Sequence, residues 1–509
     1  MEPTLTPVPT TTSAINVDIE SQAQAQAHNK ETDGHITATT TSSNSNEVIV
    51  DWDGSDDPAN PLNWSSRRKG FIIFIVSALT FNISLAPTIF APGVPLLLSE
   101  FHSDSTSLAS FVVSAYVLAF AIGPLVFAPL SELYGRRVVF WGSNLAFLVF
   151  TIVCAVSNSI GLFVTFRILQ GLAGCVPLVL GGGVIGDLVP IEKRGRALSG
   201  WQLGPLLGPV IGPVAGGYIA QNLGWRWSFW ILAILSAVLS FLNFLVPETY
   251  HPVLLSRKAA RLQSQDGSVI YIAAGRARST KKELFLKSIV RPLKMMRSPI
   301  VLILSLQLGI TYGYLYLLFT TFTFVFEEQY HFQPGAAGLA YLGLGVGFLG
   351  SLFFQSLTSD YFAKKQAEAN GGKIKPESRL GPLVTGVLFV PVGLFWYGWT
   401  AQYKIHWIVP IIGTSFIGVG TNLVWIPIQS YLIDAFTIYA ASAIGANTVI
   451  RSVFGVLLPL AGQPLYDRLG LGWGNSLLGF IALATVPLTW LLMKKGEKIR
   501  LHPRFQIDF

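Results

Sequence analysis

The chain has 509 residues, of which 51% are hydrophobic and only 12% are charged, and its formal net charge is +8. Soluble domains carry about 25% charged residues, so this chain has too little polar surface to cover a soluble fold of its length. The composition excludes an ordinary soluble protein and indicates that much of the exterior faces lipid. Cys154 and Cys175 both lie in apolar segments and predict no disulfide framework.

Residues 1–60 are rich in Thr, Ser, Gln and Asn and contain few large apolar side chains. This composition predicts a disordered N-terminal segment. No apolar run there precedes a small-residue cleavage site, so we expect no cleaved signal peptide.

Apolar runs long enough to cross a hydrocarbon core of about 30 Å recur along the rest of the chain. The first six lie near residues 70–92, 108–130, 138–157, 160–187, 197–220 and 228–247, and the second six near 299–326, 336–358, 381–400, 405–433, 442–464 and 473–493. A polar, basic loop covers residues 248–298 and a basic tail covers 494–509. We therefore predict an all-α membrane protein with twelve transmembrane helices in two six-helix, pseudo-symmetric bundles, at 61–247 and 299–493.

Lys and Arg fall mostly in the loops on the side of the N-terminus. With that side inside, only Arg226, Lys404 and Arg468 lie in outer loops. The positive-inside rule therefore places both termini, the central loop and the tail in the cytoplasm.

The two halves of the chain repeat several features. An acid followed by bases four and five positions later occurs at equivalent turns: Glu132 with Arg136 and Arg137, and Asp360 with Lys364 and Lys365. The run from Pro213 to Gly216 is echoed from Pro459 to Gly462. Parallel repeats of this kind are typical of transporters whose halves tip about a site near the midplane.

The charged turn of the first half has two interpretations. Asp187 ends the fourth span on the same face, so it can join Glu132 and Arg136 in an ion network that closes one end of the protein. Arg137 and the second-half residues Asp360, Lys364 and Lys365 complete this predicted pair of latches. The alternative is a topology anchor that only fixes orientation.

Arg167 and Gln170 lie inside the fourth span. A guanidinium at that depth costs about 2.5–3.5 kcal/mol, so it should face the protein interior with partners. One interpretation is a fixed charge that responds to protonation of a nearby acid and so couples protons to transport. The other is an arginine bound to backbone carbonyls that pins the helix to its neighbours.

The fifth span carries small residues with a period of four. They are Gly204-Pro205, Gly208-Pro209, Gly212-Pro213 and Gly216-Gly217. A period of four keeps them on one slowly turning stripe, against which another helix can approach closely. We expect this stripe at the interface between the halves, where it would allow sliding without a proton leak. Close packing alone is the alternative.

These segments resemble a known family. The run 123–137, GPLVFAPLSELYGRR, is similar to the loop signature of the major facilitator superfamily, and 167–171 resembles its R-x-x-Q-G motif. The Gly-Pro stripe resembles the motif of its drug/proton antiporters. Residues 51–53 and 60–64, and 247–250 with 254–259, are similar to segments of the fungal antiporters with twelve spans, which export drugs, polyamines and secondary metabolites.

The resemblance implies proton-coupled efflux of small amphipathic organic molecules by alternating access, with the proton gradient as driving force and no cofactor. It implies a monomer in the plasma membrane, with the vacuolar membrane as the alternative, whose partners are the lipid bilayer, protons and a small-molecule substrate but no nucleic acid. Two other functions remain open on the same fold: a proton symporter that imports a nutrient, and a sensor that transports nothing.

Polar and aromatic residues near the midplane are the candidates for substrate binding. They are Asn82, Tyr116, Gln202, Gln307, Tyr312, Asn422, Trp425, Gln429, Asn447 and Arg451. Each has the alternative role of an interhelical hydrogen bond or a packed ring. No carboxylate falls clearly at the midplane, which favours neutral or weakly acidic substrates, and Arg167 or Arg451 can attract an anion.

Other classes of function lack their sequence signals. No G-x-x-x-x-G-K-[ST] loop for an ATP-driven pump occurs, and the seven histidines have no metal-ligand spacing. We therefore predict neither an enzyme nor a metal site. The central loop includes a basic amphipathic segment from Lys281 to Lys287, which either lies on the anionic inner leaflet or is a solvated linker.

Overall fold

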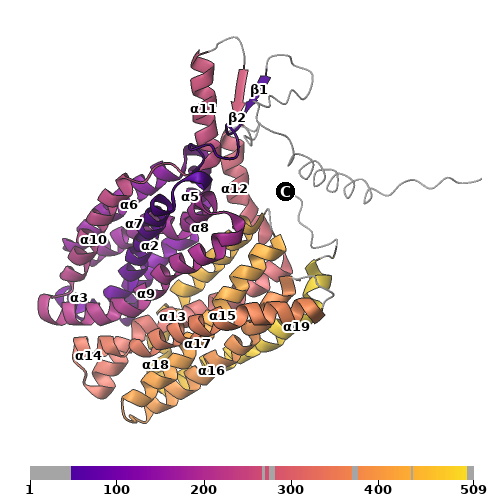
Figure 1. Cartoon of the computed structure of the whole chain (residues 1–509). Coiled ribbons are helices and arrows are strands. Elements are labelled where there is room, and N and C mark those ends of the chain that lie inside the picture. Colours follow the sequence, from indigo (N-terminus) through magenta and orange to yellow (C-terminus); the bar gives the residue numbers. More distant parts are fainter. Residues whose placement is uncertain are drawn as a thin grey trace, which may run out of the picture. The chain divides into compact units, whose positions relative to one another are not determined.

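The computed structural model describes residues 47–265, 270–273, 281–369, 376–436, 439–500 and 502. Contacts among these residues divide the chain into two compact units. The small unit falls within Met1–Asn63 and Leu255–Arg276, and the large unit within Trp64–Leu254 and Ala277–Phe509. Figure 1 shows the small unit with its two strands, β1 and β2, and the helical large unit.

The small unit joins the N-terminal segment to the central loop. Strand β1 (Glu47–Val50) pairs in parallel with β2 (Ile270–Ala273), and Val50 packs with Ala273 and with Leu255 and Ala259 of α11 (His251–Gln265). The expected disorder of 1–60 is therefore wrong for 47–60. Val48, Ile49 and Val50 pair with a strand more than two hundred residues away, and the buried Asp57 carboxylate accepts the N–H groups of Asp53 and Ala59. Residues 1–46 lie outside the part of the chain that the structure describes.

Six spans form the first half of the large unit. They are α2 (Ser66–Ile89) with η2 (Ala91–Gly93) and α3 (Val94–Glu100), α4 (Thr106–Leu118) with η3 (Ala119–Ala121) and α5 (Gly123–Tyr134), α6 (Arg136–Ala155), α7 (Ile160–Gly174) with α8 (Val176–Leu188), α9 (Ile191–Leu223), and α10 (Arg226–Phe244). Prolines stand at the start of α3, α5 and α8, where the missing N–H of proline costs no helical hydrogen bond.

The second half is built in the same way. After α12 (Lys281–Met295) come α13 (Pro299–Tyr330), α14 (Pro334–Leu339) with α15 (Leu342–Ala369), η4 (Pro376–Leu380), α16 (Gly381–Gln402), α17 (Ile408–Phe436), α18 (Ala440–Ala484) and α19 (Val486–Arg500). Several elements run beyond the predicted spans: α9 begins six residues before 197, α15 continues to Ala369 rather than 358, and α19 continues to Arg500 rather than 493.

The helices account for the predicted twelve spans. By length and composition ten helical stretches of the described chain can cross a membrane, and the bent pair Ser107–Ala121 and Gly123–Tyr134 makes an eleventh span. The stretch Ala440–Arg500 is too long for one crossing, because α18 alone has 45 residues and would measure about 68 Å if straight. Gly470 divides it with a non-helical backbone at φ 72°, which glycine adopts readily. The all-α fold with two groups of six spans is confirmed.

The two halves pack on each other inside the large unit. α4 packs against α13 and α18, and α9 packs against α14 and α15. Val117 of α4 and Val210 of α9 belong to the apolar core of the second half. On the outside, large side chains such as Phe241 are left exposed, as expected of helices in lipid. These contacts place the interface between the halves along α4 and α9 of the first half and α13, α14, α15 and α18 of the second.

Candidate functional site

The centre of this interface holds a buried cation among aromatic rings. Arg451 of α18 is 4% exposed, and its guanidinium carbon lies 4.2 Å from the ring centre of Trp425 and 4.8 Å from that of Tyr312. Its Nε is buried without a hydrogen-bond partner, and no ion pair links Arg451 to a carboxylate in the described part of the chain. A desolvated guanidinium with aromatic neighbours and no acid is suited to bind an anionic or polar group of a flat ligand.

The first half contributes to the same region. Gly455, one turn along α18 from Arg451, lies so close to α4 that an added Cβ would stand 3.3 Å from Val117 and 3.0 Å from Tyr312. Tyr116, next to Val117, is fully buried and within electrostatic range of Tyr312 and Tyr316. Tyr116, Tyr312, Tyr316, Trp425 and Arg451 are called here the aromatic cluster. Sequence reasoning missed Tyr316, although its ring centre lies 4.8 Å from that of Tyr312, one helical turn away.

Arg167 lies beside the cluster in the first half and is completely buried. Its Nη1 donates to the carbonyl of Ala86 (3.3 Å) and to Gln170 Oε1 (3.0 Å), and its Nε donates to the carbonyl of Val112 (3.4 Å). Gln170 in turn donates to Thr151 Oγ1 at 2.7 Å. The Nη2 group has no partner among the described residues. These bonds pin α7 to α2, α4 and α6, and they leave one donor of a buried cation free.

The remaining candidates are distributed through the bundle. Asn422 donates to the carbonyl of Phe348 and to Ser351, Gln307 donates to Thr489, and Asn447 donates to Ser305, so these three tie neighbouring helices together. Asn82 is buried, Gln429 is half-buried, and Gln202 is exposed on α9. The structure therefore brings Tyr116, Tyr312, Trp425 and Arg451 together and leaves the other candidates outside this cluster.

One end of the large unit carries the charged turn between α5 and α6, called here the basic end. Arg136 Nε lies 3.4 Å from Asp187 Oδ2, as the predicted network requires, and Arg136 Nη1 donates to Ser131 Oγ at 2.6 Å. Glu132 is exposed and forms no ion pair with the residues that the structure describes. Its carboxylate lies within electrostatic range of Arg136 and Arg291, but the ion pair expected of it with Arg136 is made by Asp187 instead.

A different acid occupies the centre of the basic end. Glu248 is 3% exposed, and its carboxylate accepts backbone N–H groups of Arg136 (2.9 Å), Arg137 (3.2 Å), Thr249 (3.1 Å) and Tyr250 (3.0 Å). The first two are the opening N–H groups of α6, which have no partner within the helix. Gly135 has φ +97°, and a Cβ there would overlap the Glu248 carboxylate. A glycine turn thus lets the carboxylate cap α6.

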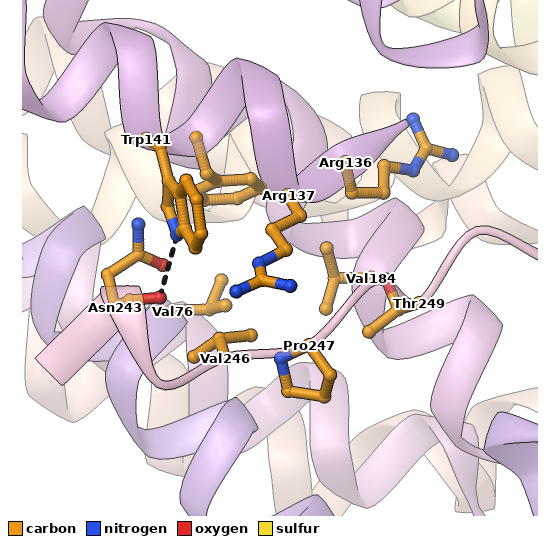
Figure 2. Close-up of a pocket in the computed structure, with 10 residues that line it drawn as sticks. Val76, Arg136, Arg137, Trp141, Val184, Asn243, Val246, Pro247 and Thr249 are labelled. Carbon is orange, nitrogen blue, oxygen red and sulfur yellow. Dashed lines mark hydrogen bonds between the residues drawn. The ribbon is translucent and has the colours of Figure 1, made fainter. Parts of the chain in front are cut away.

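Beside this turn lies a small pocket with room for about one water molecule, at about 10 Å³. Figure 2 shows Arg137 between Trp141 and the irregular segment at Val246 and Pro247, which follows α10. The Arg137 guanidinium carbon is 4.0 Å from the Trp141 ring centre, and Trp141 Nε1 donates to the Asn243 carbonyl at 3.0 Å. Burial raises the pKa of Tyr250, whose ring lies 4.6 Å from the Arg136 guanidinium carbon. The packing holds Pro247–Tyr250 against α6.

The second copy of the charged turn belongs to α15. Asp360, Lys364 and Lys365 lie on α15, but their side chains fall outside the described part of the chain.

The small-residue stripe of α9 faces α2 within the first half. A Cβ at Gly204 would lie 2.6 Å from the Ser77 carbonyl, one at Gly208 would lie 2.7 Å from Ser84, and one at Gly216 would overlap the Ile89 carbonyl. Thr88 Oγ1 also donates to the Gly208 carbonyl at 3.2 Å. Our expectation that the stripe lies between the halves is therefore wrong for most of its length. The intervening helix α2 fills the groove that these glycines leave.

The far end of the stripe does reach the second half. A Cβ at Gly217 would overlap the Pro334 carbonyl, one at Gly338 would overlap the Pro213 carbonyl, and Gln221 Oε1 accepts the Gly335 N–H at 3.0 Å. We call this region the α14 end. A separate cavity of about 600 Å³ is lined from both halves by residues including His102, Asp104, Phe324, Glu328 and Gln463.

Two packed six-helix bundles, with a buried cationic and aromatic cluster where they meet, define the fold of a secondary transporter. Residues 71–459 match the family model described as Major Facilitator Superfamily. The chain therefore belongs to the Major Facilitator Superfamily.

Known proteins agree with this assignment. The chain is 54% identical over 463 residues to the MFS-type transporter penM of Penicillium rubens, covering 91% of each chain. It is 46% identical over 462 residues to the efflux pump radE of Floropilus chiversii, covering 90% of this chain and 86% of the relative. The xylose transporter XylE of E. coli, in a partially occluded inward-open conformation, shares the fold with a TM-score of 0.64 and 17% identity, over 84% of this chain and 98% of that one. The protein is a multi-pass membrane transporter and not an enzyme.

Proposed function

We propose that this transporter exports small amphipathic organic molecules, neutral or weakly acidic, in exchange for protons. The observation that carries the proposal is Arg451, which is buried between Trp425 and Tyr312 without an acid partner among the described residues. A buried cation of this kind attracts an anionic or strongly polar group, and the rings favour a flat apolar body. A relative named as an efflux pump supports export.

Proton coupling is the second part of the proposal. Arg167 and Gln170 are the residues that we assign to it, because Arg167 is a fully buried cation with one donor free and lies within electrostatic range of Tyr316 in the aromatic cluster. The Arg167 guanidinium is held in the first half and interacts electrostatically with Tyr316 of the second half. A change of protonation near Arg167 can therefore be linked to the movement of one half against the other. We further propose a monomer in the plasma membrane, with both termini in the cytoplasm.

Proteoliposomes with an imposed pH gradient test the proposal with a panel of anionic, neutral and cationic amphipathic fluorophores. We expect neutral and weakly acidic members to accumulate against their gradient in acid-inside vesicles, because exit of protons drives their entry. Arg451→Leu should reduce accumulation about 30-fold or more, because loss of a desolvated charge contact costs about 2–5 kcal/mol. Arg451→Lys, which keeps the charge, should retain part of it.

The coupling role is tested in the same vesicles. Arg167→Ala should remove the dependence on the pH gradient while the protein still inserts. Accumulation only in alkaline-inside vesicles would make the protein a proton symporter, and the absence of flux for every compound would favour a sensor. Unchanged gradient-driven transport by Arg167→Ala would remove Arg167 from the coupling mechanism.

A further inference from the structure

Helix α12 (Lys281–Met295) has one face packed against the bundle. Pro292 and Met295 are buried, and Pro292 lies 3.4 Å from the position of a Cβ added to Gly445 of α18. α12 also packs on α5 of the first half. The Arg291 guanidinium carbon stands 5.8 Å from the ring centre of Tyr439, which precedes α18. This face fixes α12 at the basic end, in contact with both halves.

The opposite face of α12 is an uncovered apolar stripe. Leu286, Val290 and Leu293 are 60%, 36% and 48% exposed. Their spacing of four and three residues places them on one side of the helix, about half a turn away from Pro292 and Met295. Three large apolar side chains on one exposed face of a short helix favour contact with an apolar phase over contact with water.

The position of α12 in the chain indicates that the apolar phase next to Leu286, Val290 and Leu293 is the lipid bilayer. α12 is separated from the membrane-spanning α13 (Pro299–Tyr330) by only three residues, so its C-terminal end must lie at the level of the membrane surface. Lys294 and Arg297, both exposed, lie at this end. Basic residues that flank an apolar stripe complement anionic lipid headgroups and attract the helix to such a surface.

We propose that α12 lies on the bilayer surface at the basic end, with Leu286, Val290 and Leu293 in the apolar boundary layer and Lys294 and Arg297 on anionic headgroups. Because α12 contacts α5 of the first half and α18 of the second, its attachment to the leaflet anchors the region where the two halves meet to the membrane surface. The structure thereby favours a surface-bound helix over the solvated linker that the sequence left open.

Site-directed spin labelling of the full chain tests this proposal independently of any substrate. Val290→Cys is labelled and reconstituted in nanodiscs of phosphatidylcholine, with or without phosphatidylglycerol. Cys154 and Cys175 are buried and should react little. Phe241→Cys on the exposed surface of α10 gives the lipid reference, and Gln265→Cys at the exposed end of α11 gives the aqueous reference. Oxygen and a nickel chelate report accessibility to lipid and to water.

We expect the label at position 290 to be more accessible to oxygen than to nickel, as at position 241, and to move deeper when phosphatidylglycerol is present. The double variant Lys294→Gln/Arg297→Gln should abolish the shift caused by the anionic lipid. A label as accessible to nickel as that at position 265 in both lipids would overturn the proposal. A label shielded from both reagents would overturn it too, because protein would then cover the stripe. An equal depth in both lipids would refute the binding of anionic headgroups.

Discussion

Glu248→Ala is expected to destabilise the protein by about 3 kcal/mol or more. The carboxylate accepts four backbone N–H groups in a buried position, and a hydrogen bond to a charged group contributes about 1.5–3 kcal/mol. Its loss leaves the first N–H groups of α6 unpaired and removes a negative charge from the positive end of the helix. Thermal unfolding in detergent measures the effect with a thiol-reactive dye, because Cys154 and Cys175 are buried until the protein unfolds.

Glu132→Ala is the matched control. Glu132 lies at the same charged turn but is exposed, and it forms no ion pair with residues in the described ranges. Its replacement should change stability by no more than about 0.5 kcal/mol, as is usual for exposed sites. Equal losses in the two variants, or a larger loss for Glu132→Ala, would show that Glu248 does not organise the basic end.

Gly216→Ala is expected to have the second largest effect. The new Cβ would overlap the Ile89 carbonyl of α2, a backbone atom that can move only with its helix. Overpacking costs about 1–3 kcal/mol, and overlap with a backbone atom places Gly216→Ala near the upper end of that range, above the gain of about 1 kcal/mol from the better helix propensity of alanine. We expect a lower melting temperature and loss of transport, measured by the same dye assay and by the proteoliposome assay.

Gly200→Ala on the same helix is the control for Gly216→Ala. No atom lies within 4 Å of a Cβ at position 200, so only the propensity term acts and the melting temperature should stay equal or rise. If Gly216→Ala is as stable as Gly200→Ala, the close approach of α2 to α9 is not the reason that position 216 requires glycine.

The sequence predicted the transmembrane helices and their division into two groups of six better than it predicted which helices pack against each other. Span length and the positions of charges follow from composition along the chain, and this is enough to predict two groups of six spans. The period of four in α9 predicted a small-residue stripe but not the helix that covers it. α2 carries no matching pattern, and its carbonyls at Ser77 and Ile89 make the contact through the backbone, which sequence does not distinguish.

The site was predicted in part for a similar reason. Arg136 and Asp187 pair as expected, but the sequence did not predict that Glu248 accepts the backbone N–H of Arg136, because the turn at Gly135 contacts a segment more than one hundred residues away. Tyr312, Trp425 and Arg451 were identified as isolated midplane residues. That they form one cluster depends on how α13, α17 and α18 pack, although the helical spacing from Tyr312 to Tyr316 was a usable signal for the missed residue.

We propose that the two bundles move about the aromatic cluster and open it to one side at a time. Double electron–electron resonance on the full chain in nanodiscs tests it with two pairs of spin labels, at acidic and alkaline pH and with a transported member of the panel. One pair, Leu223→Cys with Leu339→Cys, spans the α14 end, and the other, Lys193→Cys with Lys495→Cys, spans the basic end; all four positions are exposed. We predict reciprocal changes, with the distance at the α14 end lengthening in the conditions that shorten the one at the basic end. Distances that stay fixed in every condition, or that lengthen together, would contradict alternating access.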